Sequence, residues 1–343
     1  MDNTASRFLL DCTLRDGGYV NNWAFDTDTA LQIRDALYAS GIRYIELGIM
    51  GRGGVPGKTT KFSSFDEVRP LLLNRREDCH YCVMVTQTEL AASSLEIPPR
   101  NAETVDVIRL AYFKAEKAAA LVSASELIAK GYTVFLQAMA TFMYTEDELA
   151  IMLNEINQIR PAAFYIVDSF STMYGSDISR MADLVLKQLH KDILFGFHAH
   201  NNIQMAYSNA ITFISIQTDH TLMIDGSIFG MGRGAGNVPL ELLMEYMNRT
   251  LNENYRISPV LSAFEKLIEP IFKNYPWGYS IPYLLTASKG MNSAYSWYLE
   301  RKGITSPGDI NDILEGIPET IRYTLDPGAA DQAIADHFLR KEI

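Results

Sequence analysis

Short apolar runs alternate with longer amphipathic segments through most of the chain, a pattern typical of strands that each lead into a helix. The runs that we predict to be strands are Phe8–Leu14, Tyr44–Ile49, Tyr81–Val85, Val105–Leu110, Thr133–Met139, Phe164–Val167, Leu194–His198 and Leu222–Ile228. The segments with helical spacing are Thr27–Ala39, Ser64–Leu73, Ala115–Lys130, Glu146–Ile159, Ile178–Leu189, Met205–Ile216 and Pro239–Met247. The connection Glu89–Ala102 is a weak helix candidate because Pro98 and Pro99 interrupt it.

Strands that alternate with helices in this way form parallel sheets covered by helices, and eight such strands predict a closed (β/α)8 barrel, the TIM barrel, over residues 1–249. An open doubly wound sheet is the alternative, but its usual glycine-rich fingerprint is missing after the first strand. After about Arg249 the alternation stops, and helical patterns interrupted by prolines follow. We therefore expect a smaller, mostly helical domain over residues 250–343.

The composition is that of a globular protein, with 48% hydrophobic and 21% charged residues. The net charge of −11 and the lack of a basic patch argue against nucleic-acid and anionic-membrane partners. No apolar stretch approaches the roughly 18 residues of a membrane span, and Met1–Arg7 lacks the apolar core of a signal peptide. We expect a cytoplasmic protein. Cys12, Cys79 and Cys82 are expected to be buried or incidental thiols, because their odd number does not indicate a disulfide framework and no second Cys-x-x-Cys pair completes a zinc site.

Two histidines stand at the end of the seventh predicted strand, His198 within it and His200 just after it. Side chains alternate along a strand, so histidines two residues apart point the same way and can share one cation. Two imidazoles suit Mn, Fe, Co or Zn, and one carboxylate would complete a three-ligand site with open positions. The alternative is a pair of loop histidines with ordinary hydrogen-bond partners.

Arg15-Asp16-Gly17-Gly18 follows the first predicted strand and contains a suitable carboxylate. In a barrel, active sites lie at the C-terminal ends of the strands, and alternate strands contribute side chains to the same layers. Because Asp16 leaves the first strand and the histidines end the seventh, we expect Asp16, His198 and His200 to form one metal site. An Asp-Gly turn with a solvated carboxylate is the alternative.

Arg15 beside a metal ligand is suited to hold an enolate or carboxylate while a C–C bond is cleaved or formed. An ion pair with Glu46 is the alternative role for Arg15. Gln137 and Ser169 lie at the ends of predicted strands, where we expect substrate contacts, although either side chain could instead satisfy its neighbours. Arg109, within the fourth strand, needs a partner or a ligand.

Three segments resemble the signatures of the metal-dependent lyases related to HMG-CoA lyase: Thr13–Gly17, His198–Asn202 and Gly234–Glu241. The resemblance covers the barrel and, more loosely, the C-terminal part, and 4-hydroxy-2-oxovalerate aldolases are the most similar branch. The third segment begins within a glycine-rich turn that follows the eighth predicted strand. Such a turn is by itself only a weak sign of an anion site.

The resemblance implies that the three predicted ligands bind a divalent cation, Mn²⁺ foremost, with Mg²⁺, Co²⁺ or Zn²⁺ as alternatives. Asn237 matches a metal ligand of the HMG-CoA lyase branch. Arg15 would stabilise a pyruvate enolate, and Tyr295 resembles a tyrosine of the aldolases' second domain that reaches towards the active site.

Tyr19 departs from the family pattern. The similar aldolases have a histidine there, which acts as acid or base on the substrate hydroxyl, and the acyl-CoA-condensing branch usually has glutamine. A tyrosine with a pKa near 10 could relay this proton only if the metal and Arg15 lowered that pKa. We expect Tyr19 to be the acid–base candidate, with a metal-bound water or another residue as the alternative.

The predicted function is therefore cleavage of a 4-hydroxy-2-oxoacid to an aldehyde and pyruvate by a metal-dependent aldolase. The alternatives are a Claisen-type acyltransferase, which the acidic composition disfavours because CoA phosphates need a basic cleft, and a non-catalytic partner-binding subunit. A non-haem iron oxygenase also uses two histidines and a carboxylate, but usually on a β-sandwich. The expected partners are a small-molecule 2-oxoacid, a second copy in a homodimer and, by resemblance, a dehydrogenase docked through the C-terminal domain.

Overall fold

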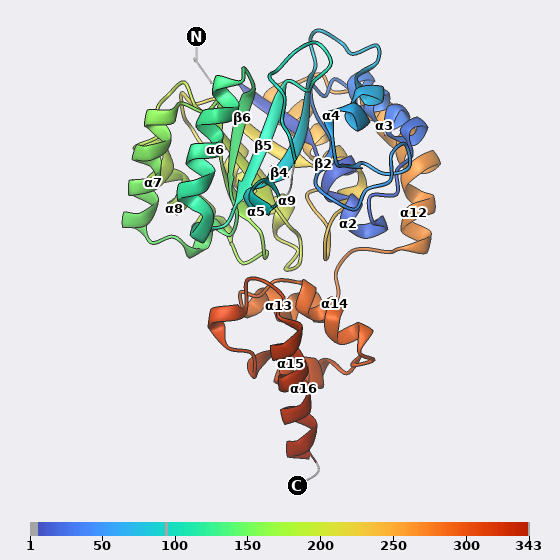
Figure 1. The fold of residues 1–343 in the computed structure, drawn as a ribbon, viewed down its shortest axis with the longest axis vertical. Helices are drawn as coiled ribbons and strands as arrows, with labels where there is room; N and C mark the ends of the chain where they lie inside the picture. The colour runs from blue at the N-terminus through green and yellow to red at the C-terminus, as the bar shows by residue number, and fades with distance from the viewer. Residues whose placement is uncertain (1–5, 93–94, 342–343) are drawn as a thin grey trace.

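The structure, a computed structural model, describes residues 6–92 and 95–341 (Figure 1). Its parallel strands form one nine-stranded sheet in the order β1-β9-β8-β7-β6-β5-β4-β2-β3, and the pairing of β1 with β2 closes the sheet into a barrel. The strands are β1 (Arg7–Asp11), β2 (Tyr44–Met50), β3 (Lys61–Phe62), β4 (His80–Thr86), β5 (Val107–Tyr112), β6 (Thr133–Ala138), β7 (Ala163–Asp168), β8 (Leu194–Ala199) and β9 (Leu222–Gly226). The predicted TIM barrel is confirmed, with the short β3 added beside β2.

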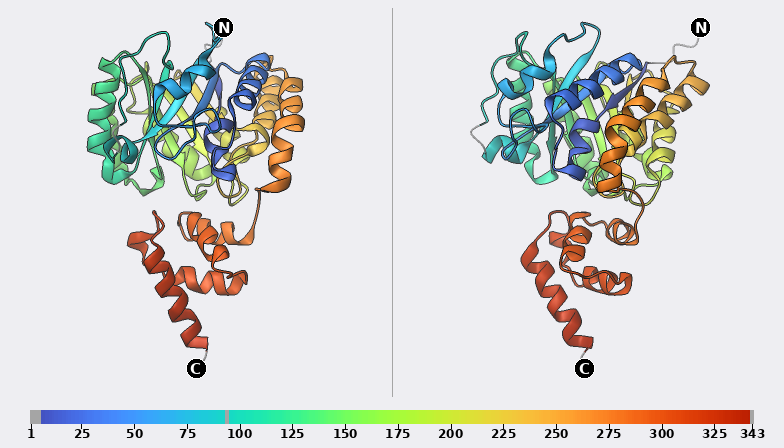
Figure 2. Two further views of the ribbon diagram at one scale, coloured as in Figure 1. Left: turned by 45° about the vertical axis from the view of Figure 1, so that its right-hand side comes forward. Right: turned by 90° about the vertical axis from the view of Figure 1, so that its right-hand side faces the viewer.

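The helices cover the outside of the barrel and continue beyond it (Figures 1 and 2). They are α1 (Thr13–Asp16), α2 (Gly18–Asn21), α3 (Thr27–Ala39), α4 (Phe65–Val68), α5 (Gln87–Ala92), α6 (Lys117–Ala129), α7 (Glu146–Ile159), α8 (Gly175–Leu186), α9 (Ala206–Ile214), α10 (Leu240–Leu251), α11 (Ile257–Ala263), α12 (Glu269–Asn274), α13 (Ile281–Ser288), α14 (Ala294–Arg301), α15 (Pro307–Glu315) and α16 (Pro327–Lys341). Single turns are η1 (Arg69–Leu72), η2 (Lys114–Glu116), η3 (Thr141–Met143), η4 (Ile228–Gly230) and η6 (Glu319–Ile321), and η5 (Phe264–Ile268) is a π-helical turn between α11 and α12.

The first strand is shorter than the predicted Phe8–Leu14, because the chain turns at Asp11. The Asp11 carboxylate accepts hydrogen bonds from the backbone N and the Oγ1 of Thr13, at 3.0 and 2.7 Å. These bonds end the strand and start α1, so Arg15 and Asp16 lie on a helical turn at the barrel mouth instead of on the strand itself.

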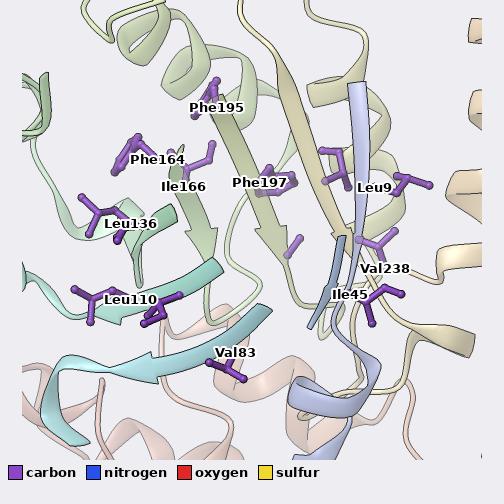
Figure 3. Packing of buried hydrophobic residues seen from close by; sticks show 14 of the residues in the cluster. Leu9, Ile45, Val83, Leu110, Leu136, Phe164, Ile166, Phe195, Phe197 and Val238 are labelled. Atoms are coloured by element: carbon purple, nitrogen blue, oxygen red, sulfur yellow. The ribbon is translucent and has the colours of Figure 1, made fainter. Parts of the chain in front are cut away.

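Side-chain alternation along the strands separates two layers of the core. Leu9 faces the helices, in the large cluster whose members include the residues labelled in Figure 3, whereas Leu10 faces the barrel interior. The interior cluster also contains Cys12 and Cys82, and all three cysteines are buried and free, as predicted. The two-residue period of the strands therefore directs one set of side chains to the helices and the other to the barrel axis.

The C-terminal helices divide between two hydrophobic cores. Val260 and Ala263 of α11, together with Ile268, belong to the core of the barrel. A separate cluster forms among α13–α16 and includes Met291, Tyr295, Leu299, Ile310 and Ile313. The change of core thus falls between α12 and α13, later than the boundary predicted at residues 249 and 250, and the division into two domains stays a prediction.

Helices α13–α16 lie across from the barrel mouth, on the side where α2 follows the first strand (Figures 1 and 2). The rings of Phe170, just after β7, and Tyr323 stack with centroids 6.1 Å apart and so connect the two parts. No helix in the described ranges is long and apolar enough to cross a membrane. Most of Met1–Arg7 and the outer ends of both predicted domains lie outside the described residues.

Candidate metal centre

Asp16, His198 and His200 meet at the mouth of the barrel. The Oδ2 atom of Asp16 lies 3.4 Å from Nε2 of His200, and one potential ligand atom from each of the three residues lies within 4.8 Å of the others. All three side chains are buried. Barrel closure thus brings together groups that are more than 180 residues apart in sequence, and they form a candidate metal site.

The polar atoms of this site lack the partners that buried groups normally have. Asp16 Oδ2, His198 Nε2 and Asn237 Oδ1 are buried and accept or donate no hydrogen bond within the described part of the chain. An unsatisfied buried polar group costs roughly 1–3 kcal/mol, so three such groups side by side require an explanation. A divalent cation would satisfy them, since carboxylate, imidazole and amide atoms are suitable ligands.

Asn237 lies beside the other three residues. It forms an isolated backbone bridge with His200, and its amide Nδ2 donates to the carbonyl of Met231 at 3.0 Å. A Cβ atom built on Gly232 would come within 2.4 Å of Asn237 Nδ2 and 2.9 Å of Asp16 Oδ2, so a larger residue there would displace these two side chains. The role of Asn237 as a metal ligand stays a prediction, which its unpartnered Oδ1 supports.

Both histidines are oriented by hydrogen bonds through Nδ1. His198 Nδ1 lies 2.8 Å from Asp225 Oδ2, and His200 Nδ1 lies 3.2 Å from the carbonyl oxygen of Asp168. Each Nε2 therefore remains for the metal, an arrangement common around metal-bound histidines. Burial lowers the pKa of His198 to about 4 despite the pairing with Asp225, so its imidazole is neutral at pH 7 and can bind a cation.

A chain of buried charges surrounds the site. Arg15 Nε donates to Glu46 Oε2 at 2.7 Å, and Arg109 Nη1 donates to the same oxygen at 2.7 Å. Arg15 Nη1 pairs with Asp16, and Arg109 Nη2 pairs with Asp225. Burial alone would raise the pKa of the Asp16 carboxyl, but Arg15 and His200 hold that pKa well below its usual value. Asp16 is therefore a carboxylate at pH 7.

One donor of Arg15 is left over. Its Nη2 is buried and has no hydrogen-bond partner among the described residues. The guanidinium is fixed by Glu46 and Asp16, so this N–H group is held rigidly beside the metal ligands. A negatively charged oxygen placed there would receive a charge-assisted hydrogen bond.

Gln137 and Ser169 already have partners within the barrel. With its amide oxygen turned towards Arg109, Gln137 accepts from Nη2 at 2.7 Å and from Nε at 3.0 Å. The hydroxyl of Ser169 accepts from the backbone N of Ala140 at 2.8 Å. These contacts hold the mouth together, and substrate binding by either residue stays a prediction.

The two predicted catalytic tyrosines lie in different surroundings. Tyr19, on α2, is 41% exposed, and its ring packs edge-on against Trp23 with centroids 4.7 Å apart. Tyr295 is buried in the core of α13–α16, where its hydroxyl lies 2.7 Å from the carbonyl oxygen of Ile321 and accepts from the backbone N of Asp326 at 3.1 Å. The Tyr295 hydroxyl thus bonds within its own group of helices, and a catalytic role for it stays a prediction.

Asp225 is the site residue that the sequence analysis missed. It lies on β9 and is fully buried, and it contacts both His198 and Arg109. The signal was present, because a lone carboxylate inside the apolar run Leu222–Ile228 needs a buried partner.

The comparisons with known proteins follow this geometry. The sequence matches the HMGL-like family over residues 7–265. It is 28% identical to oxaloacetate decarboxylase of Mycobacterium tuberculosis over 246 residues, which is 70% of each chain. It is 25% identical to 4-hydroxy-2-oxovalerate aldolase of Pseudoalteromonas translucida over 277 residues, 77% of this chain and 76% of the relative. The carboxyl transferase domain of Rhizobium etli pyruvate carboxylase is alike in fold, with a TM-score of 0.71 at 11% identity over 100% of this chain and 62% of that chain.

Proposed function

Because the chain belongs to the HMGL-like family, we propose that it is a divalent-metal-dependent aldolase that cleaves a 4-hydroxy-2-oxoacid into an aldehyde and pyruvate. The observation that carries the proposal is the set of buried, unpartnered atoms on Asp16, His198 and Asn237, beside the spare N–H of Arg15. The names of relatives at about 25% identity support the class of reaction, since both a 4-hydroxy-2-oxovalerate aldolase and an oxaloacetate decarboxylase act on 2-oxoacids.

The residues present fit a divalent cation, which Asp16, His198, His200 and Asn237 would hold. When bound, such an ion supplies a Lewis acid for the carboxylate and carbonyl of a 2-oxoacid, with Mn²⁺ as our first choice among Mn²⁺, Mg²⁺, Co²⁺ and Zn²⁺. Asp225 and the carbonyl of Asp168 would keep the two imidazoles aligned for it.

In the proposed cleavage, the 4-hydroxyl loses its proton, the C3–C4 bond breaks, and its electron pair passes to C3 and the 2-oxo group. The aldehyde leaves, and a proton at C3 converts the remaining enolate to pyruvate. Arg15 Nη2 would donate to the oxygen on which the charge develops, and Glu46 would keep that guanidinium from turning. Tyr19 is our candidate for the proton transfer, because it lies one turn beyond the Arg15-Asp16 pair.

The test uses protein stripped of metal and reloaded with each of the four cations. Pyruvate released from 4-hydroxy-2-oxoacids of several chain lengths is read with lactate dehydrogenase and NADH, and the aldehyde is measured separately. We expect activity that requires metal and is lost in His200→Gln but kept in His220→Gln, which removes another buried histidine away from the site. Absence of metal-dependent pyruvate at every chain length would refute the proposal.

Tyr19 favours a second candidate function, the decarboxylation of a 2-oxoacid with a carboxylate on C3. That reaction breaks a C–C bond and releases CO₂, and it needs no base to remove a hydroxyl proton. This reaction does not depend on the histidine that the similar aldolases have where this chain has the half-exposed Tyr19. Pyruvate and CO₂ from oxaloacetate, above the rate with metal alone and without any aldehyde from the hydroxy acids, would select this candidate.

We also propose a homodimer and a docked dehydrogenase, on the resemblance to the aldolases alone. Native mass spectrometry of the purified chain, alone and with the candidate dehydrogenase, would test each of these assemblies.

A further inference from the structure

A pocket of about 450 Å³ lies between the barrel mouth and the C-terminal helices, and we call it the aromatic pocket. Its walls include Tyr19 of α2, Trp277 of the connecting segment and Trp297 of α14. Tyr19 and Trp297 remain 41% and 48% exposed, although large aromatic side chains on a folded protein are usually better covered. Aromatic surface gathered in a hollow is typical of a ligand site.

The aromatic pocket adjoins the metal centre. Gly232 lines the pocket, and its Cα lies so close to Asp16 and Asn237 that a Cβ there would overlap both side chains. One face of this glycine therefore meets the candidate metal ligands, and the pocket begins at the same residue. A substrate with its 2-oxoacid end at Asp16 has room for its other end in the aromatic pocket.

Arg233 is the charged side chain of the pocket, and no carboxylate is among the residues that line it. The Arg233 guanidinium lies 5.5 Å from the Tyr19 ring centroid, and Nη2 donates to the carbonyl of Ser169 at 3.4 Å. No acidic side chain pairs with it in the described ranges, whereas the buried Arg15 and Arg109 both have carboxylate partners. In a chain with a net charge of −11, a half-buried arginine without an acidic partner still has guanidinium N–H groups that can donate to an anion.

The start of helix α14 borders the same pocket. Ser293 and Ala294, where α14 begins, are part of its lining. The first N–H groups of this helix are already used, because Ala294 N and Tyr295 N both donate to Asn292, so the positive charge for an anion comes from Arg233. An uncharged tail could use the aromatic walls, but it would bury the guanidinium without compensation.

We propose that the aromatic pocket binds the aldehyde half of the substrate, and that this half carries an acidic group, a carboxylate or a phosphate, recognised by Arg233. The proposal rests on the proposed aldolase function and adds the substrate class to it. Tyr19 and Trp297 enclose the carbon chain that connects the acidic group to the reacting hydroxyl. The pocket selects against a neutral aldehyde half because such a group would bury the Arg233 guanidinium without an anionic partner.

Binding is tested separately from catalysis. Protein with Mn²⁺ and oxalate, which occupies the metal centre, is titrated with 4-hydroxybutyrate, 2-hydroxyethyl phosphate or neutral butan-1-ol, and tryptophan fluorescence reports on Trp277 and Trp297. We expect saturable binding of at least one acid, no saturable response to butan-1-ol, and a Kd at least tenfold weaker in Arg233→Gln. The acid that binds identifies the group as carboxylate or phosphate.

The matched control is Arg52→Gln, which removes a 70% exposed arginine from the loop after β2, outside the pocket lining. Its Kd should stay within threefold of that of the unaltered protein. Binding of neither acid, or equal binding by Arg233→Gln and the unaltered chain, overturns the proposal whatever the enzyme activity is.

Kinetics in the condensing direction then connects the pocket to the reaction. Pyruvate is offered with succinate semialdehyde or with butanal, and the ratio of the two kcat/KM values is the measure. We expect the ratio to favour the acidic aldehyde and to fall at least tenfold in Arg233→Gln but not in Arg52→Gln. A ratio that Arg233→Gln leaves unchanged counts against the pocket. Lack of product with every aldehyde counts against the aldolase function, and the binding titration still decides the pocket.

Discussion

Replacing Asp225 by asparagine tests whether the buried carboxylate prepares His198 to bind a metal. Asp225 Oδ2 lies 2.8 Å from His198 Nδ1, and the same oxygen pairs with Arg109. The amide oxygen of asparagine can still accept the hydrogen bond from Nδ1, so the tautomer is kept while the negative charge is lost. The imidazole then becomes a weaker donor to the cation at Nε2.

The size of the effect follows from the position of the pair. Removal of such a partner typically weakens metal binding about 10–100-fold, which is roughly 1.4–2.8 kcal/mol. The loss should fall near the upper end, because His198 and Asp225 are both buried and their interaction is little screened by water. A stability loss of a few kcal/mol accompanies it, since Arg109 keeps only Glu46 as a carboxylate partner.

The assay is a Mn²⁺ titration by calorimetry at pH 7, restricted to protein that circular dichroism shows to be folded. Asp106→Asn is the matched control, because it removes another buried carboxylate of the barrel, one just before β5 whose hydrogen bonds come from Arg75, Arg100 and the backbone N of Tyr81 instead of a histidine. We expect the control to bind Mn²⁺ within threefold of the unaltered chain. Equal affinities in Asp225→Asn and the control would show that the carboxylate does not support the metal ligand.

Three further substitutions have outcomes that the structure predicts. Burial raises the pKa of Asp11 from 3.8 to about 7, so the folded chain holds a proton that the unfolded chain releases; the contribution of Asp11 to the free energy of unfolding should fall between about pH 4 and pH 7, by up to about 4 kcal/mol, and urea titrations should show it as a pH-dependent difference between the unaltered chain and Asp11→Asn. Tyr295→Phe should lower the unfolding free energy by about 1–3 kcal/mol but keep kcat within threefold, and a tenfold fall in kcat of folded protein would restore a catalytic role. Arg15→Lys keeps the positive charge but loses the planar guanidinium that Glu46 holds in place. Stopped-flow kinetics should show kcat about 10²–10³-fold lower, and a change in kcat under threefold would contradict enolate stabilisation by Nη2.

The meeting of the three candidate metal ligands could be predicted because local geometry and barrel topology both constrain them. His198 lies on β8 and His200 one residue beyond its end, so side-chain alternation predicts that they point the same way, and any closed barrel brings the C-terminal ends of its strands to one mouth. The predicted end of β1 was too late, but the predicted site was not affected, because the turn at Asp11 leaves Asp16 at that mouth. Predictions that depend only on which end of a strand a residue occupies tolerate errors of a few positions.

The charge network could not be predicted, because its partners are chosen across the barrel interior. Several acidic residues lie within the apolar strands and could pair with Arg109 of β5. Side-chain alternation alone does not predict which of them lies in the same layer of the barrel interior as Arg109. The structure pairs it with Glu46 of β2 and Asp225 of β9. That choice depends on strand register and shear, which follow from the packing of the whole barrel.

The buried network also bears on function, because it is costly for the fold. Apolar residues of similar volume can replace buried ion pairs with little loss of stability, so Glu46, Arg109 and Asp225 are poor choices for stability alone. Their contacts lead to the site: Glu46 holds Arg15, and Asp225 holds His198. Tyr295 is the opposite case. It matches a tyrosine of the similar aldolases in sequence, but within the described structure its hydroxyl bonds only to the C-terminal helices and the segments between them. A residue's contacts, more than its place in a motif, therefore indicate which group it supports: Asp225 contacts the candidate metal centre and Tyr295 contacts the C-terminal helices, and the catalytic role of Tyr295 stays a prediction.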